Sequence, residues 1–264
     1  MRGARRKNVM NASSMATGVA LVLLGMFGPA WSHEVTLWPA QNEKAVKLTM
    51  YFGDPGDYQP IDRIRFVELA VFDSKGTKIS FLRDIESGAD NKSLPTPKLR
   101  LGDWPGGTYV AESRYDNGFY IHDSENRAVA TTKEWFADAI DSAHYMKFSK
   151  ALFHVGASSE GYDRTIGHRL EFIPRADPFA ARDGTPVPVE VRFDGSVLKN
   201  HIVEIGDDTA AAKGPEVRTD DRGIILVKLD HKGFYRLAVE HRAPSKYPDL
   251  YAYDDYTASL VFAR

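Results

Sequence analysis

Histidine side chains carry the candidate chemistry of this 264-residue chain, which contains eight His, 36 Asp plus Glu and no Cys. Without thiolates, a metal site must be built from imidazole, carboxylate, thioether or backbone groups. Imidazole nitrogens suit late first-row ions such as nickel, cobalt and copper. Three histidines occupy positions where a ligand would be useful, and we expect them to be the metal ligands: His33, His168 and His241.

His33 follows a segment that has the three parts of a secretory signal. Four basic residues lie within the first seven positions, and an apolar run covers residues 16–27. The small residues Ala30 and Ser32 stand at positions minus three and minus one of a cut after Ser32. The apolar run is shorter than the roughly 20 residues of a membrane-spanning helix. We therefore predict that residues 1–32 are a cleaved signal peptide and that the protein is periplasmic. A cut after Ala30 would instead leave Trp31 first.

Cleavage after Ser32 would give His33 a free α-amine beside its imidazole. These two nitrogens form a bidentate chelate for a transition metal. The competing interpretation is that His33 is simply a frayed first residue, as in many exported proteins. The expected chelate therefore requires cleavage after Ser32 and a well-ordered segment after His33.

His168 and His241 lie on predicted strands. His168 shares one face with Leu170 and Phe172, a position where a core histidine satisfied by a polar partner is a common alternative to a ligand. His241 ends a strand whose apolar face includes Val239, and it is either a ligand at the mouth of that face or a surface histidine. A site at the junction of two domains would bring both to His33.

The charge of the chain argues against nucleic acid or an anionic membrane as the partner. Removal of Arg2, Arg5, Arg6 and Lys7 with the leader leaves 30 basic against 36 acidic residues, a formal charge of −6. No basic stripe remains to neutralise phosphates. The sequence also contains no nucleophile elbow, phosphate-binding loop or dinucleotide fingerprint.

Alternating apolar and polar residues predict an all-β fold. Such runs cover residues 35–38, 45–52 and 63–73, with a possible bulge near Val67, and short strands recur regularly after residue 184. A single helical insertion is expected over residues 132–143. We predict two β-sandwich domains of immunoglobulin-like type, the first at 33–180 and the second at 184–264.

Several motifs in this order resemble one known family: the start His33-Glu34-Val35-Thr36-Leu37-Trp38-Pro39, the run from Tyr145 to Leu152, the strand from Gly167 to Pro174 and the hairpin from Thr219 to Gly223. The chain is similar to the periplasmic domain-of-unknown-function family numbered four-one-nine-eight, which carries a nickel and cobalt uptake label related to NikM-type components. The resemblance spans the predicted mature chain. It implies a metal-associated, all-β periplasmic protein with a prealbumin-like carboxyl domain.

These observations predict a metal-binding accessory protein. It would hold nickel, cobalt or copper through His33 and further histidines, and would buffer the ion or pass it to an uptake transporter or outer-membrane receptor without inserting in the membrane. One alternative is a copper enzyme that uses the amino-terminal histidine as a brace for oxidative chemistry. Another is a metal-free periplasmic binding module.

Overall fold

The computed structural model describes residues 33–264, except residues 86–90, 97, 102–103 and 208–213. The described residues form one compact unit. The described residues contain eighteen strands and three single turns of 3-10 helix, η1 (Arg63–Arg65), η2 (Leu82–Asp84) and η3 (Lys133–Trp135). The predicted all-β, sandwich-type fold is therefore confirmed. The predicted signal peptide lies outside the described residues.

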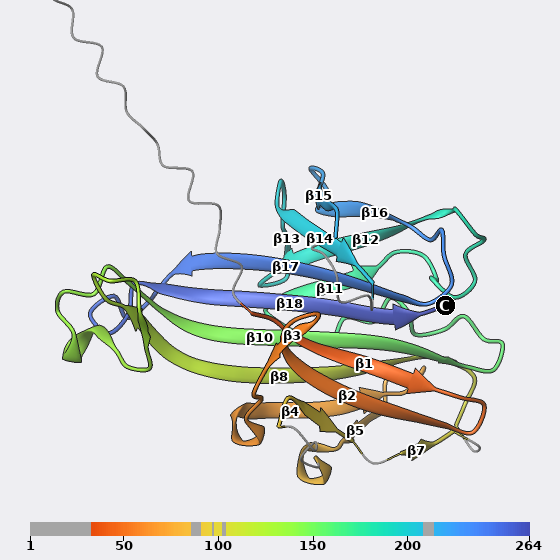
Figure 1. Cartoon of the computed structure of the whole chain (residues 1–264). Helices are drawn as coiled ribbons and strands as arrows, with labels where there is room; N and C mark the ends of the chain where they lie inside the picture. Colours follow the sequence, from red (N-terminus) through yellow and green to blue (C-terminus); the bar gives the residue numbers. More distant parts are fainter. Residues whose placement is uncertain (1–32, 86–90, 97, 102–103, 208–213) are drawn as a thin grey trace, which may run out of the picture. The chain divides into compact units, whose positions relative to one another are not determined.

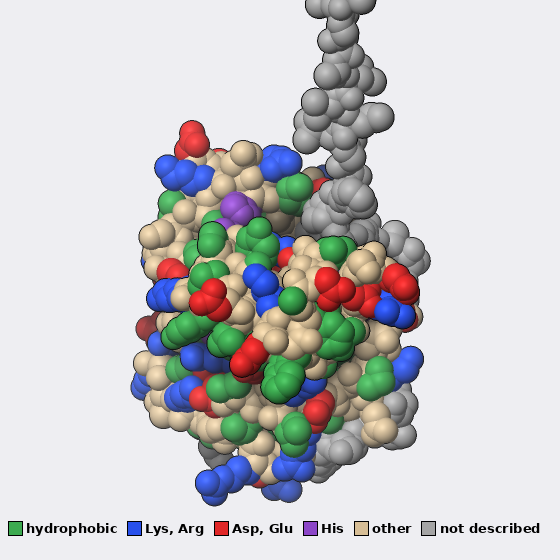
Figure 2. Space-filling view, turned by 90° about the vertical axis from the view of Figure 1, so that its left-hand side faces the viewer, with side chains coloured by type: hydrophobic (Ala, Val, Ile, Leu, Met, Phe, Trp, Pro, Cys, Tyr) green, Lys and Arg blue, Asp and Glu red, His purple; other side chains and the backbone are tan. Residues whose placement is uncertain are grey.

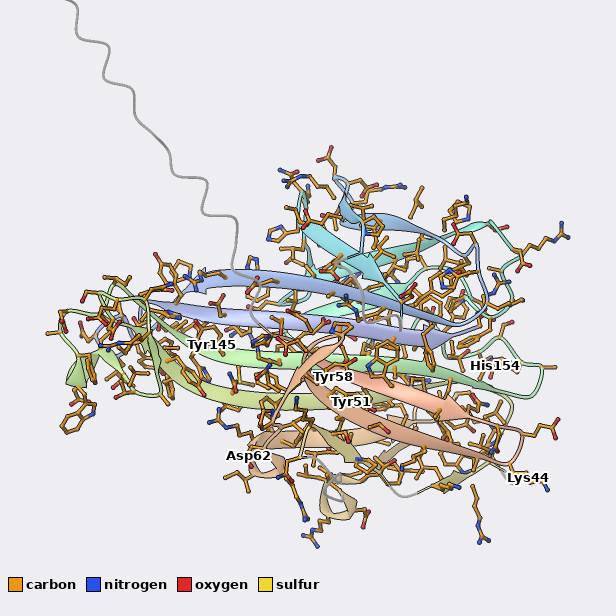
Figure 3. The ribbon with its side chains drawn as sticks, in the orientation of Figure 1. Lys44, Tyr51, Tyr58, Asp62, Tyr145 and His154 are labelled. Atoms are coloured by element: carbon orange, nitrogen blue, oxygen red, sulfur yellow. The ribbon has the colours of Figure 1, made fainter. Side chains whose placement is uncertain are left out.

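A long central sheet organises the fold (Figure 1). Eight of its strands follow the order β15-β14-β17-β18-β10-β8-β4-β5, and β9 pairs with β8. Their bounds are β4 (Phe66–Phe72), β5 (Lys78–Ser80), β8 (Gly107–His122), β9 (Ala128–Val129), β10 (Asp141–Val155), β14 (Ile202–Gly206), β15 (Glu216–Arg218), β17 (Phe234–Pro244) and β18 (Tyr253–Ala263). Figure 3 labels Tyr145 and His154, which lie far apart along β10.

Two smaller sheets complete the fold. The first contains β1 (Val35–Gln41), β2 (Ala45–Asp54), β3 (Asp57–Gln59), β6 (Ser93–Pro95) and β7 (Leu99–Arg100). The second contains β11 (Leu170–Pro174), β12 (Pro186–Phe193), β13 (Ser196–Val197) and β16 (Ile224–Lys228). In Figure 1 these sheets lie on either side of the central one.

Side-chain alternation gives the central sheet two buried faces, because successive residues of a strand point to opposite sides. On β10, Phe148 and Leu152 belong to a hydrophobic cluster shared with β11 and β12 of the second small sheet. Ala151 and Phe153 belong to another cluster, shared with β1 and β2. The fold is therefore built as three layers around two cores.

The central sheet contains strands from both segments predicted as separate domains. β10 and β18 pair in parallel over ten residue pairs, from Ala143 opposite Tyr253 to Leu152 opposite Phe262. The predicted boundary, residues 180–184, lies in the connection between β11 and β12, which are themselves paired. The division into segments 33–180 and 184–264 thus separates parts of the sequence that share sheets.

The helix expected over residues 132–143 is not formed, and the helical insertion is the single turn η3. The expected helix has no core to cover, because the side chains of Trp135 and Ile140 are exposed. Its last residues instead begin β10, which pairs with β8 along its length. The predicted bulge is confirmed, since the register between β4 and β8 shifts at Phe66 and Glu68.

Exposed apolar side chains occur where the long strands of the central sheet end. Trp135, Ile140 and Tyr247 are each more than half exposed. Figure 2, turned by 90° from Figure 1, shows hydrophobic side chains interspersed with acidic and basic ones on the face it presents. Within the described part of the chain, the helical segments are too short and too polar to span a bilayer.

Candidate functional site

The first described residues are firmly held against the central sheet. The carbonyl oxygen of Val35 accepts hydrogen bonds from the Ser149 and Ser259 hydroxyls, at 2.7 and 2.8 Å. The Gly53 amide donates to the Glu34 carbonyl at 2.9 Å. Because these bonds come from β10, β18 and β2, three strands fix the backbone directly after His33.

The Glu34 side chain provides a second anchor. Arg236 of β17 donates to the carboxylates of both Glu34 and Glu204, and all three side chains are buried. Burial, opposed by the positive charge of Arg236, raises the pKa of Glu34 to about 7. The residue next to His33 is therefore locked into the interior by an ion-pair network.

His33 itself faces outward from this anchor. Its side chain is 44% exposed, and its Nδ1 lies 3.9 Å from Oδ2 of Asp54. The imidazole packs edge-on against the Phe52 ring, with centroids 5.7 Å apart. The side chain is thus positioned by β2 on one side while it stays accessible to an ion from solvent.

A small cavity of about 10 Å³ lies beside this segment, enough for about one water molecule. Its lining includes Glu34, Asp54, Arg236 and Thr257. Three buried polar atoms of lining residues have no hydrogen-bond partner among the described residues: Glu34 Oε2, Arg236 Nε and Thr257 Oγ1. Since one water can satisfy both a donor and an acceptor, we expect the cavity to hold an ordered water.

Lys147 of β10 is a buried basic residue on the same side of the central sheet. Its Nζ lies 5.8 Å from the ring centroids of both Phe52 and Tyr145. Burial lowers the pKa of Lys147 to about 8, although acidic neighbours that include Glu240 raise it in part. Figure 3 labels Tyr145 together with Tyr51 and Tyr58, which stack at 4.4 Å on the neighbouring β2–β3 hairpin.

His168 is the satisfied core histidine that the sequence offered as the alternative. Its side chain is buried, and Nε2 lies 2.9 Å from Oε2 of Glu112. Burial lowers the pKa of His168, and Glu112 opposes that shift only in part. Although burial alone would raise the pKa of Glu112, the hydrogen bond from His168 and the charges of neighbouring cations lower it to about 2.

His241 lies against another histidine. Its Nδ1 is 3.0 Å from Nε2 of His201, and its ring contacts Phe193 with centroids 4.2 Å apart. Burial and the neighbouring His201 lower the pKa of His241. The imidazole is half-buried, and its lowered pKa favours the neutral form.

The structure does not bring His33, His168 and His241 together. His33 approaches the central sheet from the β2 side, whereas His168 and His241 contact Phe148 and Phe193 of the opposite core region. Across the described residues, no group of three or more His, Asp or Glu side chains is arranged to hold a metal ion. The expected site shared by these three histidines at a domain junction is therefore not formed.

Sequence reasoning missed several residues of these sites: Asp54, Arg236 and His201. Asp54 and Arg236 reach His33 and Glu34 only through contacts between strands that are distant in the chain. His201 lies opposite His241 because β14 and β17 are antiparallel, with Val203 opposite Val239. Residue spacing alone carries no signal for such pairs, since the strand order must be known first.

One family model matches most of the chain. The family described as a domain of unknown function (DUF4198) matches residues 30–243. The match begins close to His33 and extends past His241. No curated protein matches the chain significantly.

Solved structures show only distant similarity. A tetra-tandem repeat from the extending region of a large adhesion protein is 10% identical, with a TM-score of 0.27, over 87% of this chain and 49% of that one. This chain thus spans about half of that structure. The MG0-NIE-MG1 domains of Escherichia coli alpha-2-macroglobulin are 14% identical, with a TM-score of 0.20, over 85% and 71% of the two chains. Latent PorU from Porphyromonas gingivalis is 13% identical, with a TM-score of 0.22, over 88% and 20%. TM-scores this low do not establish a shared fold with any of the three structures.

Proposed function

The chain belongs to the DUF4198 family, and from that premise we propose that it is an exported, periplasmic metal-binding protein whose ligands begin at His33. It would hold a nickel, cobalt or copper ion and serve metal uptake or buffering. The observation that carries this proposal is the anchoring of the segment directly after His33. A frayed first residue would not be expected to have a buried neighbour fixed by hydrogen bonds and an ion-pair network.

The donor atoms near His33 suit such an ion. If the chain is cut after Ser32, the α-amine and Nδ1 of His33 supply two nitrogens, and Asp54 supplies a carboxylate oxygen 3.9 Å from Nδ1. Nitrogen and oxygen donors of this kind bind late first-row divalent ions, and solvent can complete the coordination. Both nitrogens belong to His33, so they can bind one ion without any rearrangement of the strands.

The surrounding charges also favour a cation. Glu34, Asp54, Glu204 and Glu240 line the adjacent cavity, and Arg236 is the basic residue of that lining. An excess of carboxylates near the amino terminus lowers the energy of a bound divalent ion. The same carboxylates also stabilise the protonated α-amine, so the metal must displace that proton when it binds.

Metal titration of the processed protein tests this proposal. The chain would be exported with its own leader, its first residue determined by mass spectrometry, and Ni²⁺, Co²⁺ and Cu²⁺ binding measured by calorimetry. We expect His33 as the first residue and a binding phase that weakens at least tenfold in His33→Ala. The matched control is His231→Ala, which removes an exposed histidine paired with Asp230 and should leave that phase unchanged.

Two results would contradict the proposal. One is a mature protein that begins at Trp31, because His33 would then have no free amine. The other is equal metal affinity in the wild type and His33→Ala. A role in uptake would next be tested by comparing cellular nickel accumulation in strains that carry the wild type or His33→Ala.

A further inference from the structure

His201 and His241 form a cross-strand pair at the end of two neighbouring strands. β14 and β17 are antiparallel, with Val203 opposite Val239, and this register continued by two residues places His201 directly opposite His241. Directly opposed residues of an antiparallel pair have Cβ atoms only about 4.5–5.5 Å apart. The strand pairing therefore holds both imidazoles close without any contribution from the amino terminus.

The hydrogen bonds of His201 orient its ring toward His241. Nδ1 of His201 lies 3.0 Å from the carbonyl oxygen of Lys199, which can only accept a hydrogen bond. Nδ1 must therefore carry the proton in the neutral ring, and Nε2 keeps its lone pair. That lone pair faces Nδ1 of His241 at 3.0 Å. A carbonyl that fixes the tautomer in this way is typical of metal-binding histidines.

The spacing of the two nitrogens fits a particular coordination angle. Metal-to-imidazole bonds of about 2.0–2.1 Å would span the observed 3.0 Å separation with a nitrogen-metal-nitrogen angle of about 90°. Such an ion lies to one side of the line between the nitrogens, so each ring must turn to point its lone pair at the ion. Adjacent positions of square-planar or octahedral ions have this angle, whereas a tetrahedral site would need nitrogens roughly 3.4 Å apart. The pair thus suits Cu²⁺ or Ni²⁺ better than a tetrahedral Zn²⁺.

The surroundings leave room for solvent ligands. His241 is half-buried against Phe193, which fixes one side of the ring. Asp194 follows Phe193 and forms a two-point ion pair with Arg169. Both histidine side chains remain partly open to water, so solvent can occupy the other coordination positions.

We propose that His201 and His241 are the protein ligands of a second transition-metal site, which takes Cu²⁺ or Ni²⁺ with water as the remaining ligands. This site deepens the proposed metal-binding function, but it does not depend on cleavage of the leader. In the metal-free protein, the Nδ1 proton of His241 occupies the position between the rings. Binding moves that proton to Nε2 of the same ring and leaves both facing nitrogens free to bind the metal.

Calorimetry with Ni²⁺ on the processed His33→Ala protein tests the second site by itself. We expect one remaining equivalent, weakened at least tenfold by adding either His201→Ala or His241→Ala. His154→Ala, which removes a histidine at the far end of β10, is the matched control and should have no effect (Figure 3). His241→Gln is a second variant that keeps a polar side chain, and its thermal unfolding would verify that the fold is intact.

Electron paramagnetic resonance with Cu²⁺ provides an independent readout. The His33→Ala protein should show coupling to two imidazole nitrogens at one equivalent of Cu²⁺, and His201→Ala should show fewer. Unchanged Ni²⁺ affinity and an unchanged spectrum in folded His201→Ala would overturn the second site. Failure of the amino-terminal site is a separate result, because it appears as equal binding by the wild type and His33→Ala.

Discussion

Arg236 decides whether the residue next to His33 stays in the interior. It bridges the carboxylates of Glu34 and Glu204, and its own side chain is almost fully buried. Removal of one partner from a buried ionic network leaves uncompensated charge, which typically costs about 3–5 kcal/mol. We therefore expect Arg236→Leu to lower the free energy of unfolding by that amount in urea titrations at pH 8, where Glu34 is ionised.

Arg222→Leu is the matched control for this prediction. Arg222 pairs with Asp220 on an exposed hairpin, and its side chain is 77% exposed. Exposed ion pairs contribute little to stability, so the control should change the free energy of unfolding by less than about 1 kcal/mol. Equal effects of the two substitutions would show that Arg236 does not anchor the amino-terminal segment.

Individual residues could be predicted from the sequence only where their own strand determined the environment. His168 alternates with Leu170 and Phe172, and this pattern offered a buried, satisfied histidine as the alternative to the predicted metal ligand. His201 gave no such signal, since its importance comes from its position opposite His241. Contacts between side chains of distant strands depend on topology, which residue spacing does not encode.

At the scale of elements, β1 depends on two serines of the central sheet. Ser149 and Ser259 lie opposite each other on β10 and β18, with their hydroxyl oxygens 2.8 Å apart. Both hydroxyls lie within hydrogen-bond distance of the Val35 carbonyl, so their two protons are shared among three short contacts. Either hydroxyl alone can still satisfy that buried acceptor. We expect Ser149→Ala and Ser259→Ala each to cost about 1 kcal/mol, and the double substitution to cost more than their sum.

A double-mutant cycle measured by urea unfolding gives the coupling energy directly. Hydrogen exchange of the β1 amides, measured by mass spectrometry, should rise most in the double variant because β1 then loses its link to the central sheet. The His33 metal phase should weaken in parallel. Strict additivity, with exchange of β1 unchanged, would mean that packing of β1 alone fixes the segment.

Many of the strands could be predicted from the alternation of apolar and polar residues. β1 and β2 begin at the first residues of the predicted runs, Val35 and Ala45. The helix expected at 132–143 failed because residues such as Trp135 have no core to pack on, so helical spacing had no energetic consequence there. Which strands would pair could not be predicted from the sequence. The parallel pairing of β10 with β18 joins segments about 110 residues apart.

At the scale of the whole molecule, buried ion pairs connect the layers in addition to the two hydrophobic cores. Glu112 of β8 is fully buried and contacts Lys78 of β5 at 2.9 Å, Arg114 at 3.2 Å and His168 at 2.9 Å. His168 immediately precedes the segment that enters the second small sheet. Lys150 of β10 similarly contacts Glu171 of β11 at 2.8 Å. The layers are therefore connected by buried charge pairs whose strength depends on ionisation.

Glu112 should make the stability of the molecule sensitive to acid. Its pKa is about 2 in the folded protein, against an ordinary value of 4.5. Because the unfolded chain binds the proton more readily, the stabilisation by Glu112 is complete above pH 4.5 and is lost as the pH falls toward 2. This difference corresponds to a contribution on the order of 3 kcal/mol.

Glu112→Gln should lower the free energy of unfolding near pH 7, and the gap between variant and wild type should shrink as the pH approaches 2. Urea titrations from pH 7 to 2, with Glu125→Gln as an exposed control, measure that gap, and a constant gap would contradict the assignment.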